Sequence, residues 1–146
     1  MRLPGLLALL LVVPLPAGCS GDPQADYCDA VEAHQRALSD VAASEDAGAM
    51  FGALDIYDDL REEAPRDIAD EWATVVGSLR RLEEVLADHG LDPSTYSADA
   101  PPAHLDEEGR RAIEAAAREV GSERTVAAMA AVEQHALDVC GTPLSR

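Results

Sequence analysis

The sequence predicts an all-α fold, a single bundle of four to five helices. From residue 22 onward the apolar residues recur at steps of three and four, the spacing that places them on one face of a helix. Aromatic residues make up only 3% of the chain, and with the few β-branched residues they are too sparse for a sheet. The chain has 146 residues and no internal repeat, so we expect one helical domain over 23–146.

The first helix is expected to begin at Pro23, with Asp22 as its N-cap, because proline at the first turn loses no hydrogen bond. Its apolar stripe is expected to comprise Cys28, Val31, His34 or Gln35, Leu38 and Val41. A second helix is predicted over about 45–63. Its inward residues are expected to be Met50, Phe51, Leu54, Tyr57 and Leu60.

The third helix gives the strongest periodic signal. It is expected to open at Pro65 and to stop at Gly90. Its stripe comprises Ile68, Trp72, Val75, Leu79, Leu82 and Leu86, which alternate at steps of three and four. Trp72 is the only tryptophan, and its place on this stripe predicts a core residue rather than part of a binding cleft.

Residues 91–105 contain three prolines and no helical period, which predicts a long connection. The fourth helix is expected to start at Asp106 and to bury Ile113, Ala116, Ala117 and Val120. Gly121 and Ser122 then indicate a stop followed by a new N-cap. The fifth helix, which Gly141 should end, is expected to turn inward Val126, Met129, Ala130, Leu137 and Cys140.

The first residues of the chain have the features of an export signal. Arg2 supplies positive charge, residues 6–13 form an apolar run too short to span a membrane, and small residues follow. The sequence PAGC at 16–19 resembles the bacterial lipobox, although Pro16 stands where an aliphatic residue is usual. Together with the absence of lysine and asparagine and the abundance of alanine, it resembles small lipoproteins of high-GC Gram-positive bacteria.

This resemblance implies a signal peptide over 1–18, a Cys19 that carries lipid (palmitate), and a short tether over 19–22. The protein would then lie on the outer, extracytoplasmic face of the cell membrane, held through the lipid anchor. The alternative is an ordinary secreted chain. The resemblance implies no activity and no cofactor.

With Cys19 acylated, only Cys28 and Cys140 remain, and outside the cytoplasm such a pair predicts a disulfide rather than two buried free thiols. The bridge would place the first and last helices side by side and antiparallel. Strict up-and-down winding of five helices would make them parallel, so we expect either one short lateral helix or a connection at 91–105 that crosses the bundle.

The net charge of −17 argues against nucleic acid as a partner, because nucleic-acid sites need a basic patch. Removal of residues 1–18 takes away Arg2 and no acid, which makes the remaining chain −18. We find no phosphate-binding loop, no serine elbow and no thiol paired with a histidine, so the protein is not expected to be an enzyme.

Metal binding is the other chemistry to consider. Glu32 with His34, and Glu133 with His135, are two residues apart and so point to opposite sides of a helix, which predicts no metal site and no cofactor. The residues His104, Glu107 and Glu108 enter the fourth helix together and form a candidate site for a cation or small ligand. The two glutamates are also what a helix N-terminus favours electrostatically.

The sequence therefore favours a lipid-anchored, non-catalytic interaction module whose partner is another protein of the cell envelope. The alternative is an extracytoplasmic lipoprotein that binds a small ligand or cation, through His104 and its neighbours or through a pocket between helices.

Overall fold

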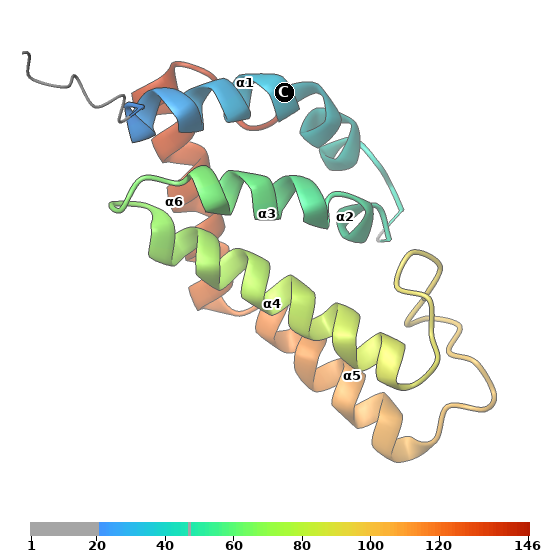
Figure 1. Ribbon diagram of the computed structural model, residues 1–146. Coiled ribbons are helices and arrows are strands. Elements are labelled where there is room, and N and C mark those ends of the chain that lie inside the picture. The colour runs from blue at the N-terminus through green and yellow to red at the C-terminus, as the bar shows by residue number, and fades with distance from the viewer. Residues whose placement is uncertain (1–20, 47) are drawn as a thin grey trace, which may run out of the picture.

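The computed structural model describes residues 21–46 and 48–146, and within these ranges the chain is helical with no strand (Figure 1). Cys19 and the expected signal peptide lie outside the described residues. The predicted all-α class is confirmed. The helices are α1 (Pro23–Ala42), α2 (Ala49–Gly52), α3 (Leu54–Glu63), α4 (Ala69–Asp88), α5 (Glu107–Val120) and α6 (Glu123–Cys140).

Helix α1 packs against α3, and α3 packs against α4. Helices α5 and α6 both pack against α4, and α6 continues behind α4 and α3 to reach α1 (Figure 1). The start of α1 and the end of α6 therefore lie together. The connection at 91–105 joins the neighbouring helices α4 and α5. The expectation that this connection crosses the bundle is therefore wrong.

The predicted disulfide is confirmed. The sulfur atoms of Cys28 and Cys140 are 2.02 Å apart and the Cα atoms 5.2 Å apart, across 112 residues of sequence. The bridge joins the start of α1 to the last residue of α6. Beyond it the tail turns back along α1, where the amide of Gln35 donates to the Pro143 carbonyl at 2.6 Å and Leu144 is buried.

The N-caps expected at Asp22 and Ser122 are present in the fold, and Asp106, expected as the first residue of a helix, is the N-cap of α5. The carboxylate of Asp22 accepts the Gln24 N–H at 3.1 Å, and that of Asp106 accepts the Gly109 N–H at 2.8 Å. The Ser122 hydroxyl caps α6, and Gly141 ends this helix in the left-handed conformation that glycine adopts without strain. Each cap satisfies backbone groups that a helix end leaves unpaired.

The second predicted helix is broken in the structure. The expected single helix over 45–63 is divided at Ala53 into the short α2 and the longer α3. Glycines 48 and 52 bracket α2, and glycine lowers helix stability by about 1 kcal/mol relative to alanine. Helix α4 also begins later than expected, at Ala69, because residues 66–68 form a turn after Pro65.

The core runs along α4. The stripe predicted for this helix is confirmed, with Leu82 the only member that is partly exposed. One cluster at the disulfide end centres on Tyr27, Val31, Leu60 and Trp72. A second joins the far end of α4 to α5 and is closed by the two ends of the connection, through Val85, Leu86, Leu91, Leu105, Ile113 and Ala116.

The face predicted for the last helix is wrong for Val126, Ala130 and Leu137, whereas Met129 and Cys140 pack against the core. Helix α6 buries Thr125, Ala128, Val132 and Ala136, and it turns Val126, Ala130 and Leu137 towards solvent. Small side chains let α6 lie close to α4, where Ala128 packs with Val75 and Leu79. Alanine and other apolar residues occur on more than one side of this helix, so its sequence alone does not determine which side faces the core.

Candidate functional site

An exposed apolar stripe on α6 is the most unusual feature of the surface. Val126 is 58% exposed and Leu137 is 48% exposed, and these are the exposed large hydrophobic residues in the described ranges. Ala130 lies between them and is also exposed. Positions 126, 130 and 137 recur at helical spacing, so they share one face, on which the exposed Glu133 also lies. We call Val126, Ala130 and Leu137 the α6 stripe.

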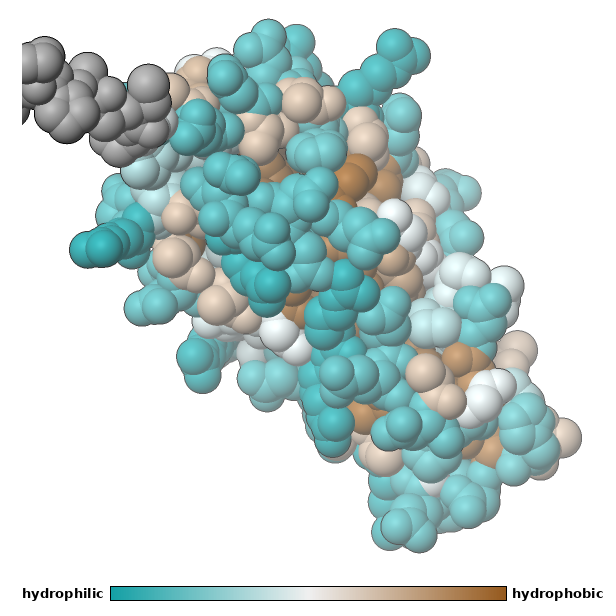
Figure 2. Space-filling model, in the orientation of Figure 1, coloured by the Kyte–Doolittle hydropathy of each residue, from teal (hydrophilic) through white to brown (hydrophobic). Residues whose placement is uncertain are grey.

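The face of the molecule shown in Figure 2 differs from the α6 stripe in the distribution of its hydrophobic side chains. It is predominantly hydrophilic, and its hydrophobic side chains appear as small separate patches. Isolated apolar residues on a surface are ordinary, whereas apolar residues that line up on one helix face mark a surface suited to contact. The α6 stripe is of the second kind.

A hollow of about 410 Å³ lies where α6 faces α3 and α4, and two residues of the α6 stripe, Val126 and Ala130, are part of its lining. It is open to solvent and mostly apolar. Its polar groups belong to Tyr57, Thr125 and Glu133. The apolar lining comes from Met50, Val75, Leu79, Val120, Val126 and Met129, together with Ala130. We call it the α6 hollow.

Tyr57 and Glu133 give the α6 hollow its electrostatic character. Burial raises the pKa of the Tyr57 hydroxyl above its ordinary value, and the negative charge of Glu133 raises it further. The hydroxyl therefore stays protonated at neutral pH. Among the described residues, Glu133 makes no ion pair and the Tyr57 hydroxyl makes no hydrogen bond to protein. Thr125 is already engaged, since its hydroxyl donates to the Glu119 carbonyl at 2.8 Å.

A second hollow, of about 390 Å³, lies further along α6 towards its C-terminal end. It is bordered by Ala130, Glu133 and Leu137 of α6 and by the C-terminal tail at Pro143 and Leu144. Its lining is half polar, unlike that of the α6 hollow. The residues of the α6 stripe therefore line two neighbouring hollows.

The predicted site at His104, Glu107 and Glu108 does not form an enclosed site. All three residues are exposed where the connection enters α5. Glu107 forms ion pairs with Arg110 and, at 3.4 Å, with Arg111 on its own helix. A carboxylate at the first turn of a helix is also stabilised by the helix dipole, so the arrangement has a structural explanation.

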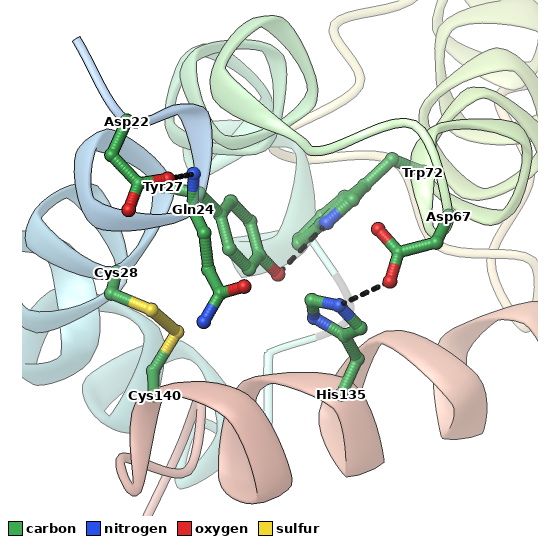
Figure 3. Close-up of a disulfide and its surroundings, with 8 residues drawn as sticks. All are labelled: Asp22, Gln24, Tyr27, Cys28, Asp67, Trp72, His135 and Cys140. Carbon is green, nitrogen blue, oxygen red and sulfur yellow. Dashed lines mark hydrogen bonds and ion pairs between the residues drawn. A yellow bond between two sulfur atoms is a disulfide. The ribbon is translucent and has the colours of Figure 1, made fainter.

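The surroundings of the disulfide form a polar cluster within the core (Figure 3). The buried Trp72 indole N–H donates to the Tyr27 hydroxyl oxygen at 3.1 Å. Burial raises the pKa of Tyr27, and the hydrogen bond from Trp72 opposes that rise. The His135 ring stands edge-on to Tyr27, with centroids 5.6 Å apart, and its Nε2 lies 3.4 Å from an Asp67 carboxylate oxygen.

The histidines are dispersed. His34 lies 3.6 Å from Asp59 of α3, while His135 faces Asp67 and Tyr27. The Nδ1 atom of His135 is buried without a hydrogen-bond partner in the described structure. In the part of the chain that the structure covers, three or more histidine, cysteine, aspartate or glutamate residues nowhere converge as metal ligands would.

An arginine-centred network fixes α3 against α4. The Arg80 guanidinium contacts Asp58, Glu83 and Asp55, with the Glu83 contact at 2.9 Å and the Asp55 contact at 3.1 Å. These hydrogen bonds, the one to Asp58 above all, raise the pKa of Arg80 beyond its usual range. Leu79, which precedes Arg80 in α4, is part of the lining of the α6 hollow.

Sequence reasoning did not find the α6 stripe or the α6 hollow. The residues of the stripe were expected in the core, and the lining of the hollow comes from five helices that only the fold brings together. One signal was present in the sequence: α6 carries more apolar residues than a single buried face can hold.

The fold and this surface define a disulfide-closed, all-helical domain with an exposed apolar stripe on α6. No family model, curated protein or solved structure matches the chain. No helix within 21–46 or 48–146 has the length and apolar character that a membrane crossing requires.

Proposed function

We propose that the protein is a non-catalytic interaction module of the cell envelope, held by a lipid on Cys19 at the outer face of the cell membrane. The observation that carries the docking role is the α6 stripe, because ordered apolar exposure on one helix face favours contact with a partner. The partner is a protein of the envelope with an apolar contact surface of its own.

Three features support the proposed location at the outer face of the cell membrane. The sequence PAGC at 16–19 resembles a lipobox. The disulfide Cys28–Cys140 is typical of proteins outside the reducing cytoplasm. The net charge of −17 keeps the domain away from anionic lipid headgroups, so that a short tether would hold it close to a membrane without its lying on the lipid.

Site-specific photo-crosslinking in intact cells tests this proposal. A photo-reactive amino acid at position 130 or 137, on the α6 stripe, is expected to give the same single adduct with one envelope protein. The same amino acid at position 117, an exposed alanine on α5, is the matched control and is expected to give no such adduct.

The lipid is tested in the same cells. Cys19→Ser should abolish the acyl mass increment and the adduct, whereas Ser20→Ala should preserve both. An equally strong adduct from position 117 would contradict docking on the stripe. A Cys19→Ser protein that keeps its acyl increment would contradict the anchor.

A further inference from the structure

We infer that the α6 hollow binds a small amphipathic cation, an apolar molecule that carries one protonated amine. This goes beyond the proposed docking of a protein on the α6 stripe and does not depend on it. The inference rests on the size of the hollow, on its apolar lining and on the position of one carboxylate and one tyrosine at it.

The size and the lining select a small apolar molecule. The volume of about 410 Å³ lies within the range of about 300–1,000 Å³ that is common for small-molecule sites. Met50 and Met129 line the hollow from different helices, and methionine side chains adapt to ligands of varied shape. An apolar ligand would release water from this lining, which is the main source of affinity at such a surface.

The polar groups select a positive charge. Glu133 is the one charged residue of the lining, and no cation pairs with it in the described ranges. Tyr57 adds an aromatic ring, which attracts cations, and a hydroxyl that has no protein partner there. Tyr57 and Glu133 line the same hollow, so one headgroup bound there would be exposed to both groups.

The same surroundings disfavour an anion. The nearest arginine on α4, Arg80, is held by Asp55, Asp58 and Glu83, so its guanidinium is not free to bind a carboxylate or phosphate. The net charge of −17 adds a long-range repulsion of anions. A fatty acid or a phosphorylated ligand is therefore a poor match for the α6 hollow.

Methyl NMR with charge-matched probes tests the inference. The chain has three methionines, and the two that line the hollow, Met50 and Met129, report on binding once their methyl groups are labelled with carbon-13. The probes are octylammonium and octanoate, which share an apolar chain and differ in headgroup charge. Octylammonium is expected to give saturable shifts of both methyl signals in the purified full chain, and octanoate at equal concentration is expected to give none.

Two variants and one control test whether Glu133 and the α6 hollow are responsible for binding. Glu133→Gln should weaken octylammonium binding by about fivefold, the size expected for one exposed ion pair. Asp138→Asn removes a carboxylate from an exposed position of the same helix outside the hollow and should leave binding unchanged. Ala130→Trp places a bulky side chain at the solvent-exposed edge of the hollow and should abolish the saturable shifts.

Equal binding of octylammonium and octanoate would overturn the inference, as would the absence of saturable shifts. So would equal losses in Glu133→Gln and Asp138→Asn, because these would indicate attraction to the acidic surface as a whole. None of these results would bear on the photo-crosslinking of a protein partner, so the two proposals fail separately.

Discussion

At the scale of single residues, the contact between Tyr27 and Trp72 explains how a tryptophan is buried completely in so small a core. Both residues are inaccessible to solvent. The indole N–H needs an acceptor when it is buried, and the Tyr27 hydroxyl supplies one at 3.1 Å. The apolar stripe expected for the first helix begins at Cys28 and does not include Tyr27.

Tyr27→Phe should therefore destabilise the fold without changing its shape. The substitution keeps the ring and leaves the Trp72 N–H buried without an acceptor, which costs about 1–3 kcal/mol in the free energy of unfolding. Urea unfolding followed by the fluorescence of Trp72, the only tryptophan, measures the change.

Tyr96→Phe is the control for this substitution. Tyr96 lies in the connection, and within the described structure its hydroxyl makes no hydrogen bond. We expect its loss to leave the unfolding midpoint unchanged. A Tyr27→Phe variant as stable as wild type would show that the hydrogen bond contributes nothing.

At the scale of elements, the start of α2 is shaped by a segment far away in sequence. Gly48 is buried against the connection, and a Cβ atom there would come within 2.2 Å of the Ser94 carbonyl oxygen. The backbone of Gly48 has an ordinary negative φ of −71°, so space rather than conformation requires glycine. This approach joins α2 to the connection at 91–105.

Gly48→Ala should consequently separate α2 from the connection and lower the free energy of unfolding by about 1–3 kcal/mol, the usual cost of overpacking. The clash is with backbone, which cannot move aside as a flexible side chain can. Thermal unfolding measures the loss, and hydrogen exchange of the amides in 91–105 should locate it.

Gly52→Ala provides the matched control on the same short helix. Nothing lies within 4 Å of a Cβ atom at Gly52, and alanine is the better helix former, so this variant should equal or exceed wild type in stability. If both substitutions lowered stability equally, the close approach of Ser94 would not be the cause.

The sequence predicted those features of the elements that are encoded locally. The caps at Asp22, Asp106 and Ser122 depend on a few neighbouring residues, and so does the stop at Gly141. The break at Ala53 and the orientation of α6 depend on packing between helices. Local helix propensity does not determine where the predicted helix over 45–63 breaks, because glycines weaken it. It also does not determine which face of α6 is buried, because alanine occurs on several faces of that helix.

At the scale of the whole molecule, the disulfide closes the fold. Replacing Cys28 and Cys140 by serine frees a loop of more than a hundred residues in the unfolded chain. The entropy regained there should lower the free energy of unfolding by about 4–5 kcal/mol.

Guanidinium unfolding of the double variant, compared with the oxidised wild type, checks this value. Reduced wild type is the internal control and should match the variant. A loss below about 1 kcal/mol would mean that native packing alone holds α1 to α6.

The candidate site depends on how the helices pack in the whole molecule, so the sequence alone did not predict it. His104, Glu107 and Glu108 are neighbours in sequence and were therefore visible, yet the fold leaves them exposed and Glu107 paired with arginines. The α6 hollow draws its lining from α2, α3, α4, α5 and α6, residues that are up to 83 positions apart, from Met50 to Glu133. Only the docked helices bring them together.

The position of the bridge also determines how the domain would transmit mechanical tension. For a chain held at its N-terminal end, a pull exerted through the α6 stripe passes from Leu137 to Cys140, across the covalent bond to Cys28, and out through the first turns of α1. This path includes little more than one helical turn on one side and about two on the other. The helices α3, α4 and α5 lie outside it, so the core between these helices would carry little of the load while the two ends of the path are pulled apart.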